Sequence, residues 1–577
     1  MKTNLSIYLI ILISLVLSAC ATMVMPEGGD VDNTPPVPES FLPPNRSTNM
    51  HKNKIVIRFD EFIILSKLTQ QLVVSPQMIE NPNIFIQGKK LVIELPDSLM
   101  PNTTYTLFFG DAVVNFKENL PVHNFSYVFS TGDVLDSLML RGTAVNAFDH
   151  HVYEELFILL YKSLDDSVLY NKKPYYLIKT EKNGDFRLNN LSPGNYQIFA
   201  LKDVNRNYIY DQPSEEIAFY DSLVIPYHPS TFVKDTADTT ALEPPPLPSA
   251  IKLYAYTETP KEVKLLSNRV ISQNKILFTF NRDIQDFKLL PIGFESDTIW
   301  HFDTKNPTGD SIFTYLMGVE KDTIFVSVAD GNNILEDSLR LILVKKKRSP
   351  VASRRKKKEE DAVETPKPIP APKLVFKNNL SQSFPFFGEV SLKFSVPLIA
   401  FHFDRIELYK AKDTLWIPIN FEAELSDTIN NQKIIIHSEF SERERYKLLV
   451  RDSTFFDIYH ATNDSIKSEF LTTEMRQYGS LKLIVNYSSQ KSLIVQLLNE
   501  KDKVIYSQLI QASGNIKYPY LPDGKYKIKA ILDENGNGKW DNGDLQTRRQ
   551  PEKIYFIPQL IDIRANWDNE QVWNIED

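Results

Sequence analysis

The chain has 577 residues, of which 42% are apolar, 24% charged and 11% aromatic. This composition is typical of a globular protein, and the length predicts four or five separately cored domains. The formal net charge of -8 is modest for this length, so the chain has no overall basic field to attract nucleic acid. Partners therefore have to be inferred from local features.

The first residues predict a lipoprotein signal peptide over 1–19. One early cation, Lys2, precedes an apolar run at 7–17 that is too short for a membrane helix. The run closes on Leu-Ser-Ala at 17–19 followed by Cys20, which is the order of a lipobox, so Cys20 is the predicted lipidation site. An ordinary signal peptide with a chance cysteine is the alternative.

Cys20 is also the only cysteine of the chain. The exported protein would then have no disulfides, and each domain would depend on its apolar core. Residues 20–38 combine glycine and proline and predict a flexible tether. No acidic residue follows Cys20 directly, which by analogy with enterobacterial sorting favours the outer membrane and leaves the periplasmic or cell-surface face open.

Period-two apolar spacing with Asn, Pro and Gly between the runs predicts a β-sandwich over 39–133. The runs are KIVIRFDEFI, NIFIQGKKLVIEL, TTYTLFFG and FSYVFSTG. Together with the preceding TPPVPESFLPPNRSTNM, they resemble the Ig-like domain of S-layer type found at the head of many Bacteroidota lipoproteins. The resemblance implies a fold and a cell-envelope setting, and it brings no catalytic residues.

A second all-β unit is predicted over 134–228. Gly194 permits a turn, after which Tyr196, Ile198 and Ala200 alternate inward along a strand. The segment Leu-Ser-Pro-Gly-Asn-Tyr at this turn resembles the transthyretin-like, or carboxypeptidase-regulatory-like, sandwich. The residues that follow, 229–249, predict a Pro-rich linker.

The rest of the chain continues this pattern. Residues 250–344 predict a further β-sandwich, interpreted as Ig-like, and 345–372 form a charged, Pro-rich linker. Residues 373–475 repeat the Ig-like pattern, and 476–577 repeat the transthyretin-like module. The predicted class is therefore all-β, with tandem Ig-like and transthyretin-like sandwiches in an elongated array.

The clearest sign of this duplication is that 521–544 repeats much of 191–214 at a constant offset of 330 (533 minus 203). A match of this length indicates a duplicated unit. Both stretches place acidic and amide residues at alternate positions, as a calcium loop does, because calcium prefers hard oxygen ligands and a sharp turn. The candidate ligands of the second copy are Asp533, Asn535, Asn537, Lys539 (through its carbonyl), Asp541 and Asp544.

The first copy is the weaker calcium candidate, because Tyr208 stands where the second copy has Gly538. Its candidate ligands are Asp203, Asn205, Asn207 and Asp211. Both copies also depart from an EF-hand, since a strand precedes the loop and no Glu occupies the twelfth position. An Asx-rich turn without metal is therefore the alternative.

Asp followed by Ser or Thr, and then by an aliphatic or small residue, recurs along the chain. The triplet resembles the O-glycosylation acceptor of Bacteroidota envelope proteins. The alternative is structural, because Asp-Ser/Thr makes a good turn before an apolar strand. The candidate acceptors are Ser98, Ser137, Ser167, Ser222, Thr236, Thr239, Thr298, Ser311, Thr323, Ser338, Thr414, Thr428, Ser453 and Ser465.

No local motif indicates catalysis: the histidines are scattered, and no phosphate loop, nucleophile elbow or cysteine nucleophile is present. The cation run at 345–358 is interpreted as a solvated linker, with an anionic polymer as an alternative ligand. The sequence thus predicts a non-enzymatic, lipid-anchored envelope scaffold or interaction protein, with calcium as its one candidate cofactor. The alternatives are a glycan-binding accessory of a polysaccharide-uptake system and, more remotely, a hydrolase.

Overall fold

A computed structural model describes residues 33–153, 155–165, 167–228, 250–294, 299–343, 373–489 and 491–576. Strands dominate this part of the chain, which confirms the predicted all-β class. The predicted signal peptide, Cys20, most of the tether and both linkers lie outside the described residues. The chain divides into two compact units, Met1–Tyr256 and Thr257–Asp577, each described by itself.

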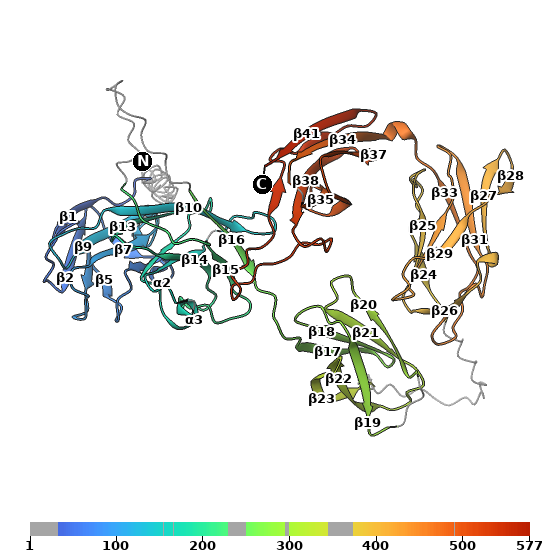
Figure 1. The fold of residues 1–577 in the computed structure, drawn as a ribbon, viewed down its shortest axis with the longest axis horizontal. Helices are drawn as coiled ribbons and strands as arrows, with labels where there is room; N and C mark the ends of the chain where they lie inside the picture. Colours follow the sequence, from blue (N-terminus) through green and yellow to red (C-terminus); the bar gives the residue numbers. More distant parts are fainter. Residues whose placement is uncertain are drawn as a thin grey trace, which may run out of the picture. The chain divides into compact units, whose positions relative to one another are not determined.

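Unit 1 begins with a β-sandwich (Figure 1). One short pair and the helical turn α2 (Leu68–Gln71) complete the sandwich. In sheet order, its strands are β1 (Pro38–Leu42), β2 (Lys54–Phe59), β6 (Lys90–Glu94) and β5 (Asn83–Gln87); then β4 (Val73–Ser75), β7 (Thr104–Gly110) and β9 (Phe125–Ser130); and the pair β3 (Ile63–Leu65) and β8 (Val113–Asn115).

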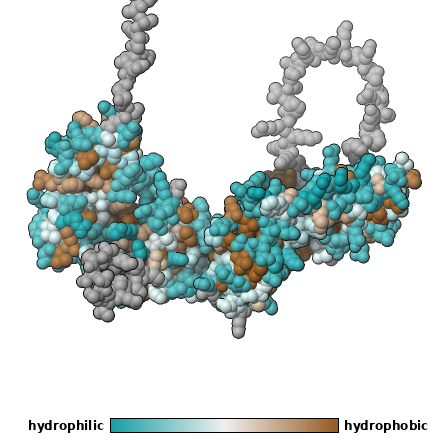
Figure 2. Space-filling view, turned by 90° about the horizontal axis from the view of Figure 1, so that it is seen from above, coloured by the Kyte–Doolittle hydropathy of each residue, from teal (hydrophilic) through white to brown (hydrophobic). Residues whose placement is uncertain are grey.

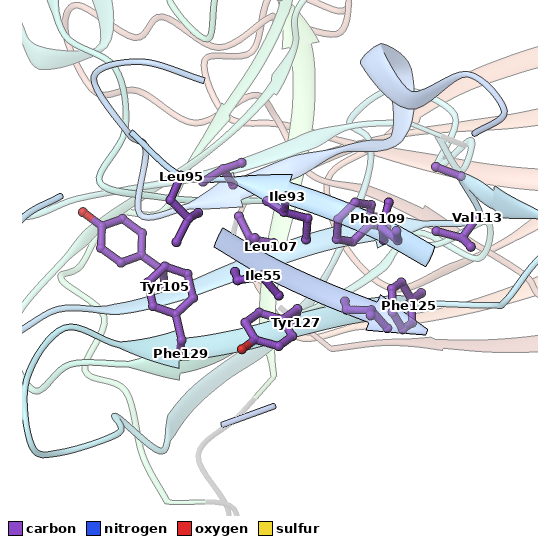
Figure 3. Packing of buried hydrophobic residues seen from close by; sticks show 14 of the residues in the cluster. Ile55, Ile93, Leu95, Tyr105, Leu107, Phe109, Val113, Phe125, Tyr127 and Phe129 are labelled. Atoms are coloured by element: carbon purple, nitrogen blue, oxygen red, sulfur yellow. The ribbon is translucent and has the colours of Figure 1, made fainter. Parts of the chain in front are cut away.

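The core of this sandwich follows from the period-two pattern of its strands. Along β2, Ile55, Ile57 and Phe59 are fully buried, whereas Lys54 and Arg58 are exposed and Val56 is half-buried. Aromatic residues of β7 and β9 meet them from the facing sheet, and the rings of Tyr105 and Phe129 stack at 5.4 Å (Figure 3). The apolar alternation read from the sequence therefore becomes a two-layer core.

The second module of unit 1 is a seven-stranded sheet with one helical turn, α3 (Val168–Asn171). Residues of its strands share one apolar core. In sheet order, the strands are β12 (Tyr176–Lys179), β11 (Phe157–Tyr161), β14 (Gln197–Lys202), β15 (Glu216–Phe219), β16 (Ile251–Thr257), β10 (Leu138–Asn146) and β13 (Asp185–Leu191).

Strand β16 corrects one predicted boundary. The sequence assigned everything from residue 250 onward to the third sandwich, but β16 pairs in parallel with β10. Leu253 and Ala255 are fully buried in the core of the second module. The strand therefore completes the second module from beyond the predicted linker at 229–249, and the third sandwich begins after it.

The third sandwich, at the start of unit 2, has one four-stranded and one three-stranded sheet. Apolar residues from both sheets form its core, including Phe278 and Val326, which are fully buried. The strands are β17 (Leu265–Ser272), β18 (Lys275–Phe280), β21 (Ser311–Leu316) and β20 (His301–Lys305), then β19 (Phe287–Ile292), β22 (Thr323–Asp330) and β23 (Asn333–Ile342).

The fourth sandwich has two four-stranded sheets, a two-stranded pair and the 3-10 turn η2 (Phe403–Arg405). A second 3-10 turn, η3 (Met475–Gln477), leads into the last module. The strands are β24 (Phe376–Asn378), β25 (Val390–Phe394), β30 (Lys433–His437) and β29 (Glu422–Leu425); β28 (Leu415–Pro418), β27 (Ile406–Lys412), β31 (Arg445–Val450) and β33 (Ile466–Leu471); and β26 (Leu398–Phe401) with β32 (Phe455–Asp457).

The last module repeats the pairing of the second. Strand β34 pairs antiparallel with β37 and parallel with β41, as β10 does with β13 and β16. Likewise β35 pairs with β36 and β38, as β11 does with β12 and β14. The strands are β37 (Gly514–Pro522), β34 (Tyr478–Tyr487) and β41 (Asp568–Ile575), then β36 (Val504–Ile510), β35 (Ser492–Asn499), β38 (Gly524–Asp533), β39 (Ile554–Phe556) and β40 (Ile561–Ile563).

The same tyrosine contact marks the turn at β14 in the second module and at β38 in the last module. The hydroxyl of Tyr196 donates to the carbonyl of Ser192 at 2.9 Å, and that of Tyr526 to the carbonyl of Pro522 at 2.8 Å. Gly194 and Gly524 lie at these turns with positive φ, as the repeat predicts.

On the face shown in Figure 2, most of the surface is hydrophilic and the apolar residues gather in separate patches.

Candidate functional site

Each candidate loop begins at a buried aspartate beside a core strand. Asp533 is 1% exposed, and its carboxylate accepts the backbone N–H groups of Gly536 at 2.7 Å and Gly538 at 2.9 Å. Asp203 accepts the N–H groups of Arg206 at 2.6 Å and Tyr208 at 2.7 Å. The first aspartate of each copy therefore holds the turn together.

The two asparagines of each loop point toward the second aspartate. In the C-terminal loop, the Nδ2 atoms of Asn535 and Asn537 both donate to Oδ2 of Asp541, the latter at 2.6 Å. In the first loop, the amides of Asn205 and Asn207 donate to Asp211 at 3.1 and 2.7 Å. The structure thus brings together four predicted residues of each copy.

The first loop keeps this shape without a glycine. Tyr208 has a φ of 63°, and Gly538 at the same position has a φ of 76°. Arg206 and Gly536 also share positive φ, at 62° and 74°. A tyrosine in the left-handed region is uncommon, so the surrounding contacts have to maintain this conformation. The missing glycine therefore does not change the path of the first loop.

Each loop is closed by a buried glutamate that the ligand spacing did not single out. Glu552 is 4% exposed, and its two oxygens accept the N–H groups of Glu534 at 2.8 Å and Asp541 at 2.9 Å. Glu215 is fully buried and accepts the N–H groups of Val204 at 3.2 Å and Asp211 at 3.1 Å. The glutamate joins the start of each loop to its second aspartate.

The structure places one predicted ligand, Asp544, away from this arrangement. Asp544 forms a bridge with Arg549, and its carboxylate accepts the N–H of Thr547 at 2.9 Å, so it caps a separate turn. Lys539 stays in the loop, where its backbone N–H donates to Oδ1 of Asn537 at 2.9 Å and its side chain is exposed. Glu552, from a more distant part of the sequence, holds the inward position expected for Asp544.

An aromatic residue anchors each loop. Trp540 packs on a small cluster formed by Ile494, Ile531 and Ile554, and its indole N–H donates to the carbonyl of Glu552 at 2.9 Å. At the equivalent position, the first copy has the buried residue Tyr210. Tyr210 contacts α3, because its N–H donates to the carbonyl of Leu169 at 3.0 Å and its ring lies 5.8 Å from that of Tyr170. The C-terminal loop is therefore anchored on a sheet face, and the first loop on α3.

The donor chemistry of the loops fits calcium. Asp533, Asn535, Asn537, Asp541 and Glu552 offer carboxylate and amide oxygens, which are the ligands that calcium prefers. Among the described residues, no group of three His, Cys, Asp or Glu side chains is positioned as a metal cluster, so a site here would need amide or backbone oxygens as well. Asparagine supplies such oxygens when its amide turns its Oδ1 inward.

Burial also affects the acidity of the closing glutamate. It raises the pKa of Glu552 above its usual value of 4.5, and the negative charges of Asp541 and Asp533 act in the same direction. The backbone N–H groups on its two oxygens oppose this rise. A cation in the loop would reverse the effect of the neighbouring carboxylates, because it would favour the charged form.

None of the predicted glycosylation sites that the structure describes is buried. Thr236, Thr239 and Thr298 fall outside the described residues. Several of the others stand directly before or at the start of a strand, as Ser137 does at β10, Thr414 at β28 and Ser465 at β33. Eight are exposed, Ser98, Ser137, Ser167, Ser222, Ser338, Thr414, Thr428 and Ser465, and three are half-buried, Ser311, Thr323 and Ser453.

A polar cleft of about 1000 Å³ lies between the first sandwich and the second module of unit 1. Amide side chains, including Gln71, Asn124 and Asn189, line it beside one aromatic residue, Phe108, and charged groups of both signs.

No helix in the described part of the chain is long and apolar enough to cross a membrane.

A profile of bacterial Ig-like domains matches residues 32–131, the first sandwich. The structure is similar to that of the S-layer protein rSbsC(31-844), with 8% sequence identity and a TM-score of 0.13. The similarity covers 91% of this chain and 67% of the S-layer chain. It is also similar to BcpA, the major pilin subunit of Bacillus cereus, with 11% sequence identity and a TM-score of 0.13. Here the similarity covers 76% of this chain and 99% of the pilin chain. No curated protein matches the sequence. The chain thus carries a bacterial Ig-like domain at its N-terminal end, in a tandem array of β-sandwiches.

Proposed function

We propose that the chain is a non-enzymatic, lipid-anchored scaffold or interaction protein of a bacterial outer membrane. The observation that carries this proposal is the series of β-sandwiches, each with its own apolar core. Such an array offers many independent surfaces and fits a role in contact and spacing. The match to a bacterial Ig-like domain supports the envelope setting.

Calcium would act in this protein as a structural ligand. Asp533, Asn535, Asn537, Asp541 and Glu552 would hold it in the last module, and the matching side chains of the first copy would hold a second ion. A hard divalent cation would neutralise the carboxylates of the loop and fix their positions. With the loop fixed in this way, Trp540 would stay packed on the sheet of the last module.

Glycan binding is the second candidate function, and the polar cleft of unit 1 favours it. Amide groups can donate to and accept from sugar hydroxyls, and Phe108 offers an apolar face for a sugar ring. A glycan array with the purified protein tests this candidate. Binding that Phe108→Ala and Asn189→Ala weaken would support it, whereas no binding to any glycan would remove it.

Membrane fractionation tests the lipid anchor. Wild-type protein should sediment with the membranes, and Cys20→Ser should lose the lipid and the membrane attachment. The same distribution for both forms would contradict the anchor. Trypsin treatment of intact cells then shows on which side of the outer membrane the protein lies, because trypsin cuts at the cations of 345–358. Release of a C-terminal fragment indicates the cell surface, and protection from cleavage indicates the periplasm.

A further inference from the structure

Strand β36 is an exposed sheet edge in the last module. It pairs with β35 on one side, and no described strand pairs with its other side. Six of its seven residues are exposed, among them Val504 at 40%, Tyr506 at 37% and Leu509 at 48%. A free edge with apolar side chains invites another strand, and proteins usually protect such an edge with charge, proline or a covering segment.

The equivalent edge of the second module is covered. Strand β12 occupies the same place beside β11 that β36 occupies beside β35. Strand β4 of the first sandwich lies next to it: Gln77 N–H donates to the carbonyl of Tyr175 at 3.4 Å, and Leu177 N–H donates to Oγ of Ser75 at 3.2 Å. Accordingly, Tyr176 and Leu177 are buried.

The fourth sandwich does not cover β36 in this way. The strand that matches β4 there is β27, and it already pairs with β28 on its outer side. Instead, the fourth sandwich contacts the last module at Tyr520, whose ring stacks on Phe387 at 4.7 Å. Within the described chain, β36 is therefore left without the cover that its counterpart has.

The composition of β36 suits pairing with a copy of itself. No charged residue occurs from Val504 to Ile510, and the nearest cation is Lys503 at one end. In an antiparallel pair, the two Lys503 residues lie at opposite ends, so no like charges face each other, whereas a parallel pair would bring them together. A bulge near Ile505 leaves Tyr506 to Ile510 as the regular stretch, about 17 Å long.

We propose that two copies of this chain associate through β36, edge to edge and antiparallel, so that the sheet of the last module continues across a two-fold axis. The contact is short compared with a standard interface of about 1,600 Å². The dimer is therefore weak and forms at high local concentration, such as proteins reach when they share a membrane. This proposal does not depend on calcium or on glycan binding.

Sedimentation velocity over a range of concentrations tests the proposal, with the chain from residue 33 onward. We expect wild type to form dimers as the concentration rises, and Leu509→Lys to weaken the dimer at least tenfold with an unchanged melting temperature. Ile79→Lys is the control, because Ile79 is 84% exposed but lies in the first sandwich. A wild-type monomer at every concentration, or a dimer that Leu509→Lys leaves intact, would overturn the proposal.

A disulfide test gives an independent readout. The chain from residue 33 onward has no cysteine, so Gln508→Cys introduces the only thiol. We expect this variant to cross-link between copies faster than Ile79→Cys under the same oxidant. Equal rates for the two variants would count against β36 as the interface.

Discussion

The carboxylate of Glu552 accepts the backbone N–H of Asp541 at 2.9 Å, and the N–H of Glu552 donates back to the carbonyl of Asp541 at 3.0 Å. This reciprocal contact closes the C-terminal Asp/Asn loop. In the first copy, Glu215 also accepts the N–H of Asp211, but its own N–H donates to the carbonyl of Gln212 at 3.1 Å. The duplicated loops therefore share the carboxylate contact and differ in the return bond.

Calcium binding should depend on Asp541 and not on Asp544. We expect Asp541→Asn to remove one bound calcium ion per chain in equilibrium dialysis, because its carboxylate lies at the centre of the loop. Asp544→Asn is the matched control and should remove none. At a free calcium concentration of 100 times Kd, one ion contributes about 2.7 kcal/mol to folding. Identical melting curves in calcium and in chelator would contradict the site.

The pH dependence of stability should reveal the burial of Glu552. Its folded pKa is raised above 4.5, so the native state takes up a proton at a higher pH than the unfolded chain does. The stability that this group contributes is therefore greatest at low pH and falls as pH rises through the folded pKa. In chelator, we expect the melting temperature of wild type relative to Glu552→Gln to decrease between pH 4.5 and 7.5. A melting-temperature difference between wild type and Glu552→Gln that increases with pH would contradict this prediction.

A fragment that ends at the predicted boundary should be unstable. Residues 33–228 lack β16, whose residues Leu253 and Ala255 are fully buried. We expect residues 33–257 to unfold cooperatively and 33–228 to lose protection of the β10 amides in hydrogen exchange. Equal stability of both fragments would show that β16 contributes little to the second module.

The tyrosine turn contact should contribute measurably in both modules. Tyr526→Phe removes the hydrogen bond to Pro522 while keeping the ring, and we expect a loss of about 1 kcal/mol in the free energy of unfolding. Tyr196→Phe should lose a similar amount in unit 1. Tyr506→Phe is the control, because Tyr506 is partly exposed on the edge strand. Chemical denaturation measures all three, and equal effects would contradict a specific role for the turn.

The fold class was predictable because strand alternation and turn residues are local signals. The duplicated turn at Gly194 and Gly524 also follows directly from the repeat. Strand β16 was missed because its partner, β10, lies more than a hundred residues earlier, and the Pro-rich segment between them reads as a domain boundary. The match between β16 and β41 becomes visible only when the whole module is compared.

The candidate site was predictable in part for the same reason. Asp533, Asn535, Asn537 and Asp541 follow a fixed local spacing, and the structure brings them together. Glu552 stands 19 residues after Asp533 (552 minus 533), so the spacing of a calcium loop does not reach it. In the first copy, Glu215 stands only 12 residues after Asp203 (215 minus 203), so the constant offset of the repeat does not match the two glutamates. Their common role becomes visible only in the structure, where each accepts the N–H of the second aspartate of its loop.

The parallel pairing of β10 with β16, and of β34 with β41, has a mechanical consequence. In each module the first and last strands lie side by side and run in the same direction. Tension applied through the two ends of the module pulls these neighbours in opposite directions along their axes. The hydrogen bonds between them then bear the load together, in shear, and they have to break almost at once for the module to open. Each of these two modules therefore resists stretching at the pair of strands through which the force enters and leaves.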